Sequence, residues 1–433
     1  MDNPRKLALA SLVKADTVSS FSNIEVNTTI TRSNMSKSDS ALYTALYLGV
    51  VERLLTLDYL ISVYSSIKID QIDTETKNAL RLGLYQLAFM DKIPEYSAVS
   101  ESVELCKKRS KGFVNAVLRA FIRAGKKIPL PEDKWLSISI GASIPMGIIN
   151  IYRESYGDEC AEKIINALVP EKGINLRINT LKATKAQICA ELEKRGITHT
   201  CSPDFDEAIT ANTPISEIKD MLDSGVVFVQ DLSSLTAIKL LAPEPSQKIL
   251  DACACPGGKS FSCAIEMENK GEILSCDLHK SKLSLIEKGA KRLGIDIIEI
   301  REQNGKIRAC ELEGAFDKVL CDVPCSGLGV IAKKPDIKYK SVEQISALPD
   351  VQYAILENCS AYVKIGGELM YSTCTLNKSE NEQVVRKFLD TCPNFEPVEL
   401  KIAGRETSGG MYTFMPHITK TDGFFVAKMK RIK

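Results

Sequence analysis

Two cysteines stand just after apolar runs that read as buried strands. Cys325 follows the run 316–322 within Asp322-Val-Pro-Cys-Ser-Gly, and Cys374 follows the run 366–372 within Ser-Thr-Cys-Thr. Parallel strands end at one edge of a sheet, so we expect both thiols at the same edge. A thiolate is a strong nucleophile, and this edge is therefore a candidate site for covalent catalysis.

A third buried strand leads into a glycine turn. The stretch 248–259 runs from an apolar segment into Pro-Gly-Gly, and 260–267 has a helical pattern. In doubly wound α/β sheets, such a strand, turn and helix form a ligand crevice at the carboxyl ends of the strands. Asp277 closes the next strand-like run, about 20 residues beyond the glycines, where a carboxylate commonly holds ribose hydroxyls. The pattern predicts a cofactor that contains a nucleoside.

The glycine turn differs from the turns that bind pyrophosphate. Neither G-x-G-x-x-G nor the P-loop pattern is present. S-adenosylmethionine contains a nucleoside but no pyrophosphate, so it fits this turn, whereas a small-molecule dehydrogenase is disfavoured. A turn that serves only strand-to-helix packing is the alternative interpretation of the stretch taken alone.

Together, the three stretches resemble the signature motifs of the RNA cytosine-C5 methyltransferases, which have the class I S-adenosylmethionine-dependent fold. The resemblance implies that Cys374 attacks carbon 6 of cytosine, that Cys325 assists release, and that Asp322 is the acid at N3. It also implies that the cofactor is S-adenosylmethionine and that it is bound by ten residues: Cys253, Ala254, Cys255, Pro256, Gly257, Gly258, Lys259, Asp277, Asn304 and Asp322.

Two of these positions depart from the family pattern. Cys255 stands where the family usually has alanine, which exchanges one small residue for another. Asn304 stands where the family usually has an aspartate that accepts a hydrogen bond from the adenine amino group. An amide oxygen can still accept, but the negative charge is lost.

The N-terminal part reads as helical from about residue 3 to 128. Apolar residues recur at helical spacing over 41–58, 77–90 and 113–121, and Ile93-Pro94 opens a further helix. This part resembles the NusB-type RNA-binding helical domain, and a plain helical bundle is the alternative. Joined to a methyltransferase, it favours RNA over a protein or a small molecule as the substrate.

The middle of the chain alternates helix and strand. We expect a helical connection over 135–168, strands over 175–180 and 226–230, and a helix over 185–194. The predicted fold is multidomain: a NusB-like all-α domain (1–130), a helical connection with a small α/β module that forms an RNA groove (131–229), and a Rossmann-like methyltransferase domain (230–433). A strand over 423–428 completes the last domain.

Composition limits the argument for nucleic acid to local clusters. The 433 residues carry a net charge of only +1, so total charge does not indicate RNA binding. Two groups of basic residues could follow a phosphate backbone, and the second should lie beside the active site. The first is Lys107, Lys108, Arg109, Lys111, Arg119, Arg123, Lys126 and Lys127, and the second is Lys333, Lys334, Lys338 and Lys340.

The cysteines and histidines suggest no metal site. Fourteen cysteines in a chain without a secretion signal read as reduced thiols. No two cysteine pairs have zinc-site spacing, and none of the three histidines has a metal-like partner nearby in sequence. We expect surface or capping roles for His199, His279 and His417, and core positions for most other cysteines, such as Cys106, Cys189 and Cys359.

The remaining expectations concern location and partners. No apolar run is long enough to cross a bilayer, and the N-terminus lacks a signal-peptide core, so we expect a cytoplasmic monomer with no membrane contact. The resemblance implies rRNA as the partner and one cytosine of 16S rRNA as the target. The same chemistry on tRNA or another rRNA site is an alternative, and a non-catalytic RNA-binding factor is another.

Overall fold

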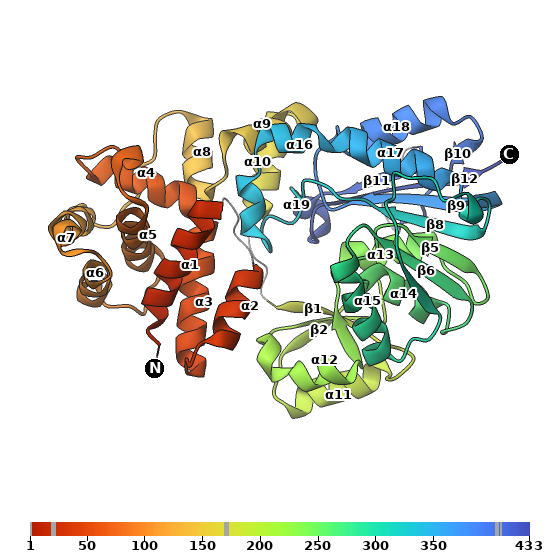
Figure 1. Cartoon of the computed structure of the whole chain (residues 1–433), viewed down its shortest axis with the longest axis horizontal. Coiled ribbons are helices and arrows are strands. Elements are labelled where there is room, and N and C mark those ends of the chain that lie inside the picture. Colours follow the sequence, from red (N-terminus) through yellow and green to blue (C-terminus); the bar gives the residue numbers. More distant parts are fainter. Residues whose placement is uncertain (1, 19–22, 169–172, 403–406, 408) are drawn as a thin grey trace. The chain divides into compact units, whose positions relative to one another are not determined.

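The computed structural model describes residues 2–18, 23–168, 173–402, 407 and 409–433 (Figure 1). The chain forms two compact units. The helical unit comprises Met1–Glu154 and Lys333–Lys340, and the catalytic unit comprises Ser155–Ala332 and Ser341–Lys433. A short segment from the middle of the catalytic part of the sequence therefore belongs to the helical unit, which the sequence did not indicate.

The helical unit is built from amphipathic helices around one apolar core. Its helices are α1 (Pro4–Val18), α2 (Asn23–Arg32), α3 (Lys37–Glu52), α4 (Leu54–Tyr64), α5 (Thr74–Phe89), α6 (Glu95–Glu104), α7 (Lys108–Arg123), α8 (Lys134–Ala142) and most of α9 (Met146–Tyr156). The predicted all-α domain is confirmed. The helical spacing over 41–58 covers two helices, because the chain bends at Arg53 (φ −107°, ψ 15°) between α3 and α4. Apolar periodicity continues through this bend, so the sequence did not reveal it.

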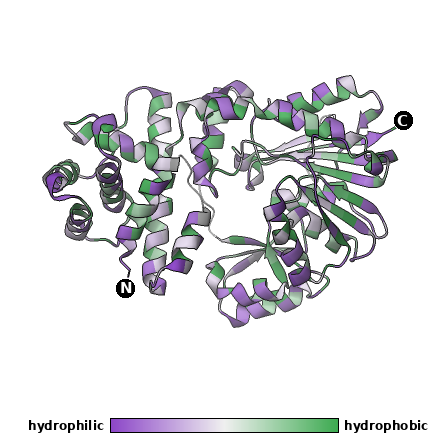
Figure 2. Cartoon of the chain, viewed as in Figure 1, coloured by the Kyte–Doolittle hydropathy of each residue, from purple (hydrophilic) through white to green (hydrophobic). Residues whose placement is uncertain are grey.

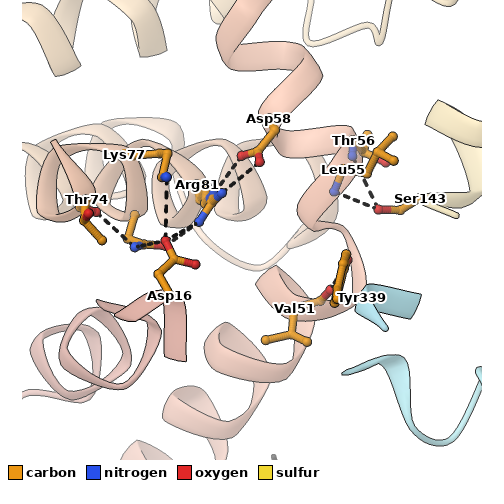
Figure 3. Close-up of polar contacts among 11 residues, drawn as sticks. Asp16, Val51, Leu55, Thr56, Asp58, Thr74, Lys77, Arg81, Ser143 and Tyr339 are labelled. Atoms are coloured by element: carbon orange, nitrogen blue, oxygen red, sulfur yellow. Dashed lines mark hydrogen bonds and ion pairs between the residues drawn. The ribbon is translucent and has the colours of Figure 1, made fainter. Parts of the chain in front are cut away.

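A buried ion-pair network lies between α1, α4 and α5 (Figure 3). The Arg81 guanidinium donates to both carboxylate oxygens of Asp58, at 2.6 and 2.8 Å, and to Asp16 at 2.9 Å. The guanidinium also donates to the side-chain oxygen of Asn78 at 3.0 Å. The guanidinium is thus matched by acceptors on three sides within the core.

The segment 333–340 packs into the helical unit through its short helix η4 (Pro335–Tyr339). The Tyr339 hydroxyl donates to the carbonyl of Val51 at 2.7 Å (Figure 3), and Lys338 Nζ donates to the carbonyls of Glu52 (3.1 Å) and Ala142 (3.4 Å). Burial lowers the pKa of Lys338 to about 8. The expectation that Lys338 follows an RNA phosphate backbone is therefore wrong, because its ammonium is buried against backbone carbonyls.

The catalytic unit begins with α10 (Asp158–Ala167) and a small antiparallel sheet. Its elements are β1 (Ile174–Ile178), α11 (Lys185–Lys194), β2 (His199–Cys201), β3 (Ala208–Ala211), α12 (Lys219–Ser224) and β4 (Val227–Val229), with strand order β2-β3-β1-β4. Strands β2 and β3 were not predicted, since three and four residues are too few to show alternation. The small α/β module itself is confirmed.

The main sheet has the order β10-β12-β9-β8-β5-β6-β7, with β11 paired to β12. Strands β5 to β9 pair in parallel and β10 to β12 are antiparallel. The strands are β5 (Lys248–Asp251), β6 (Glu272–Asp277), β7 (Ile298–Glu302), β8 (Phe316–Asp322), β9 (Val363–Thr373), β10 (Phe395–Pro397), β11 (Met411–Phe414) and β12 (Phe424–Arg431). The strand order reverses between β5 and β8, so a ligand crevice is expected at their carboxyl ends.

Helices cover both faces of this sheet (Figure 1). One face packs against α13 (Leu232–Leu241), α14 (Gly258–Glu266) and α15 (Lys280–Leu293), and the other against α17 (Leu348–Ser360) and α18 (Glu382–Thr391). Two short helices, α16 (Val342–Ser346) and α19 (Pro416–Thr419), lie in the connections. The central strands are largely hydrophobic, whereas the helices alternate in hydropathy (Figure 2). This is the pattern of a sheet buried on both sides.

In the part of the chain that the structure describes, no single helix is both long and apolar enough to cross a membrane. Helices α8 and α9 meet those criteria only when they are counted together, and they are bent by 117° at the break between them.

Candidate active site

The two cysteines predicted to share a sheet edge do so. Cys325 follows β8, Cys374 follows β9, and their Sγ atoms lie 3.3 Å apart. The parallel pairing of Asp322 with Ser372 sets this register, because each cysteine lies a few residues beyond its paired residue. The neighbouring Cys374 thiol and burial raise the pKa of Cys325 well above its usual value. The protonated form of the Cys325 thiol is therefore favoured.

Asp322 lies at the end of β8 and is held from two sides. Its Oδ2 pairs with Lys259 Nζ at 2.6 Å, and its Oδ1 accepts from the Ser372 hydroxyl at 2.7 Å. Burial alone would lower the pKa of Lys259, but the charge and the hydrogen bond of Asp322 raise it. The pKa of Lys259 therefore lies above its usual value. The Lys259 ammonium also lies 5.3 Å from the centroid of the Phe424 ring. The structure thus pairs Asp322, the predicted acid, with Lys259, the last residue of the glycine motif.

A buried carboxyl group lies at the end of β5. Asp251 Oδ2 accepts from the Ser260 hydroxyl at 2.7 Å, whereas Oδ1 has no partner among the described residues. Burial raises the pKa of Asp251 to about 7. An unpaired buried oxygen with a raised pKa is typical of a functional site. The sequence placed Asp251 in the motif but did not single it out.

The glycine turn brings the backbone close to the crevice. Gly257 has φ 108°, and a Cβ there would lie 2.4 Å from the Phe261 ring, so only glycine fits. Gly258 begins α14, and an added Cβ would meet no atom within 4 Å. The N-terminal turn of α14 is therefore open on this side, and its backbone N–H groups favour a negatively charged group.

Asp277 lies beside this turn at the end of β6. Its Oδ2 accepts from the Cys255 backbone N–H at 3.3 Å, and its Oδ1 accepts from the His279 N–H at 2.9 Å. A carboxylate oxygen can accept more than one hydrogen bond, so both oxygens retain capacity for ribose hydroxyls. The role of Asp277 as a ribose ligand stays a prediction.

Asn304 is placed next to Asp277, since the Gln303 N–H donates to the Asp277 carbonyl at 3.1 Å. The Asn304 side-chain oxygen accepts from the Lys306 backbone N–H at 3.0 Å. This oxygen was expected to accept from adenine, and it is already engaged in a local turn. The departure from aspartate therefore removes a second oxygen as well as a charge.

Three buried polar residues that sequence reasoning missed hold the two cysteine loops. Glu380 accepts from the Ser326 backbone N–H at 2.8 Å and from Gln352 Nε2 at 2.9 Å. Asn381 donates to the Thr375 carbonyl at 3.0 Å. The polar run 377–381, placed between the Ser-Thr-Cys-Thr motif and an apolar helix, was the signal that could have identified Glu380 and Asn381. They fix the loops and so the distance between the thiols.

The sheet order and this crevice define the class of protein. Three features are typical of class I S-adenosylmethionine-dependent methyltransferases: an open sheet with parallel central strands and a switch point between β5 and β8, a glycine turn without a pyrophosphate pattern, and a carboxylate at the end of the next strand. The open α14 N-terminus and the Asp277 carboxylate fit this cofactor.

Family models agree with this class and narrow it. The model described as 16S rRNA methyltransferase RsmB/F matches residues 238–430, the NusB family model matches 2–123, and a ferredoxin-like domain model of RsmF/B-like methyltransferases matches 145–216. The chain is 35% identical to the probable ribosomal RNA small subunit methyltransferase B of Bacillus subtilis, over 99% of this chain and 98% of that protein. The chain belongs to the RsmB family of methyltransferases.

Further relatives and structures are consistent with this assignment. The ribosomal RNA small subunit methyltransferase B of Klebsiella pneumoniae is 30% identical over 91% of both chains. The crystal structure of PH0851 covers 100% of this chain and 99% of its own, with a TM-score of 0.83 and 24% identity. A methyltransferase homologue from Pyrococcus horikoshii covers 70% of this chain and 100% of its own, with a TM-score of 0.61 and 26% identity. The chain is an RNA methyltransferase that uses S-adenosylmethionine.

Proposed function

We propose that this chain methylates carbon 5 of a cytosine in 16S rRNA through a covalent adduct with Cys374, with cytosine 967 as the expected target. The observation that carries this proposal is the pair of thiols, 3.3 Å apart, at the ends of adjacent parallel strands. Cys374 is needed for the covalent adduct, and Cys325 is needed for release of the product.

The first step uses the Cys374 thiolate. Carbon 5 of cytosine is a poor nucleophile, and addition of a thiolate to carbon 6 turns the ring into an enamine that can attack a methyl group. The raised pKa of Cys325 favours the protonated form of this second thiol during the attack. The pair therefore holds one nucleophile and one proton carrier at the same place.

Asp322 and Lys259 assist that step at N3 of the base. Asp322 is a carboxylate in its pair with Lys259, so it must take up a proton from solvent before it can act as the acid at N3. Delivery of that proton to N3 stabilises the enamine, and the Lys259 ammonium, 2.6 Å away, stabilises the carboxylate that remains. The Ser372 hydroxyl holds the other oxygen at 2.7 Å and so orients the carboxyl group. Lys259 then acts in the reaction in addition to lining the cofactor site.

The cofactor-binding residues are the turn 253–259 together with Asp277, Asn304 and Asp322. Gly257 and Gly258 admit the cofactor close to the backbone, and Asp277 accepts hydrogen bonds from ribose hydroxyls. S-adenosylmethionine supplies an electrophilic methyl group when it is bound. To complete the cycle, Cys325 gives up its own proton to solvent and then, as a thiolate, accepts the proton at carbon 5. The bond from Cys374 Sγ to carbon 6 then breaks and releases the Cys374 thiolate.

The helical unit supports RNA as the substrate. It matches the NusB family, and several residues of the first basic cluster remain on its surface in exposed ion pairs, such as Lys107 with Glu75 and Lys126 with Glu95. The curated relatives named above act on small-subunit rRNA by name, which favours 16S rRNA over tRNA. We propose a cytoplasmic monomer.

Bisulfite mapping tests the substrate. Unmodified 16S rRNA and total tRNA are each incubated with S-adenosylmethionine and either the wild-type chain or Cys374→Ala. We expect one protected cytosine in 16S rRNA with the wild-type chain and none with the variant. Protection confined to tRNA, or equal protection with Cys374→Ala, would contradict the proposal.

A further inference from the structure

Three side chains with metal-binding atoms meet in the small α/β module. Cys189 lies on α11, and His199 and Cys201 lie on β2. The Sγ atoms of the two cysteines are 3.7 Å apart, and a ring nitrogen of His199 lies within 4.8 Å of both. All three residues are half-buried. Sequence reasoning had placed Cys189 in the core and His199 on the surface.

Local structure explains why these three side chains lie close together. Helix α11 ends at Lys194, and Gly196, with φ 70°, returns the chain toward the helix. In β2, exposed Thr200 stands between two half-buried residues, so His199 and Cys201 share one face of the strand. The spacing His-x-Cys on a strand was the signal that could have identified them.

We propose that Cys189, His199 and Cys201 bind a Zn²⁺ ion. Tetrahedral Zn²⁺ takes thiolate ligands at about 2.3 Å, which places two such sulfur atoms about 3.8 Å apart. The observed Sγ separation of 3.7 Å matches that value. A disulfide needs about 2.05 Å, so closing one would require the two sulfur atoms to move together.

The charges and tautomers also suit this ion. Two thiolates balance the two positive charges of Zn²⁺, and the nearby Lys185 is paired with Asp206 at 3.0 Å. His199 Nδ1 lies 3.3 Å from the Ile197 carbonyl. The tautomer that donates from Nδ1 leaves Nε2 as a metal ligand, and a backbone carbonyl is a common partner for a metal-bound histidine.

The site has three protein ligands among the described residues, and water completes the tetrahedron. Three protein ligands and a water make an open zinc site, and the ion would join α11 to β2 across the turn between them. The module in turn contacts the methyltransferase part of the same unit, where the Asn179 side chain donates to the Leu293 carbonyl at 2.8 Å. Metal binding therefore stabilises the module that adjoins the cofactor domain.

Metal analysis of the full-length chain tests the site. The chain is reduced, stripped with a chelator, loaded with Zn²⁺ and freed of excess ion. We expect about one tightly held equivalent in the wild-type chain and less than about a tenth of that in Cys189→Ser and Cys201→Ser. Cys392→Ser, which removes another half-buried thiol, is the matched control and should retain the metal.

Two further measurements keep the result independent of folding and of the active-site thiols. X-ray absorption at the zinc edge should show two sulfur atoms at about 2.3 Å and a nitrogen at about 2.0 Å. Circular dichroism and retained S-adenosylmethionine binding show that the serine variants are folded. The proposal is overturned if the wild-type chain holds no Zn²⁺, if the serine variants hold as much as Cys392→Ser, or if Cys189 and Cys201 prove to be joined as a disulfide.

Discussion

Each of the two units buries a cation beside a carboxylate, and the two sites differ in completeness. In the helical unit, Arg81 donates to Asp58, Asp16 and Asn78, so its guanidinium is matched on three sides (Figure 3). In the catalytic unit, Lys259 pairs with Asp322, while nearby Asp251 keeps an oxygen without a partner among the described residues.

This difference indicates that the Arg81 network stabilises the fold, whereas the group of Lys259, Asp322 and Asp251 serves the reaction. A complete network of buried charges stabilises its surroundings only as long as every member is present. An incomplete network with a raised pKa holds groups ready for a substrate or a proton. We therefore expect changes in the helical network to affect unfolding, and changes in the catalytic network to affect activity in a chain that remains folded.

The largest expected effect on stability comes from Arg81→Ala. This change leaves Asp58 and Asp16 without their shared cation in the core and should lower the free energy of unfolding by about 3 kcal/mol. Urea unfolding measures it. Arg195→Ala is the matched control, since Arg195 also binds two carboxylates but on the surface, and it should cost less than about 1 kcal/mol. Equal losses from both changes would remove the distinction between the units.

The largest expected effect on activity comes from Lys259→Met. Loss of the ammonium removes the group that stabilises the Asp322 carboxylate, and kcat should fall roughly 100-fold to 1,000-fold. Initial rates with labelled cofactor measure this, and the S-adenosylmethionine Kd shows whether binding changes too. Lys259→Arg retains the charge and should recover part of the rate. Unchanged kcat in Lys259→Met would show that the pair with Asp322 has no part in the reaction.

A further effect concerns the pH dependence of stability. The pKa of Asp251 is raised from 3.8 to about 7 in the folded chain. Its contribution to stability is complete below pH 3.8 and is lost as pH rises through 7, because the unfolded chain releases the proton first. We expect this group to lower the free energy of unfolding by about 1.4 kcal/mol per pH unit in that window. Urea unfolding at several pH values should show a shallower decline for Asp251→Asn than for the wild-type chain, and parallel curves would contradict this.

The smallest expected effect is at Asn304. In Asn304→Asp, one carboxylate oxygen can accept from the Lys306 N–H and the other from the adenine amino group, so the S-adenosylmethionine Kd should stay the same or fall about twofold to tenfold. Calorimetry measures it. Asp277→Ala is the reference, and it should weaken binding about tenfold to 100-fold without unfolding the chain. A large loss of affinity in Asn304→Asp would mean that Asn304 does not face adenine.

The helices and strands next to the motifs could be predicted from the sequence, whereas the contacts between distant segments could not. Strands ending at Asp251, Asp277 and Asp322 were predicted because short apolar runs beside glycine or proline turns are typical of buried parallel strands. The polar support from Glu380 was missed although the polar run 377–381 was a signal for it. The packing of 333–340 in the helical unit was not predicted, since it depends on tertiary contacts that no local pattern encodes. The break at Arg53 was missed for the same reason.

The placement of Cys325 and Cys374 at one edge followed from strand order alone, but their separation of 3.3 Å did not. Register in a parallel sheet and the buried bonds of Glu380 and Asn381 set that distance. The domain boundaries at residues 130 and 229, and the individual site roles, stay predictions.

Separating the two thiols on denaturing gels tests the covalent mechanism most directly. Each variant is incubated with substrate RNA and S-adenosylmethionine. Cys374→Ala should give neither methylation nor a slow-migrating complex, because it lacks the nucleophile. Cys325→Ala should transfer the methyl group and then remain attached to the RNA, because release is impaired. A slow-migrating complex with Cys374→Ala and none with Cys325→Ala would reverse the two roles, and no complex with either would contradict the covalent mechanism.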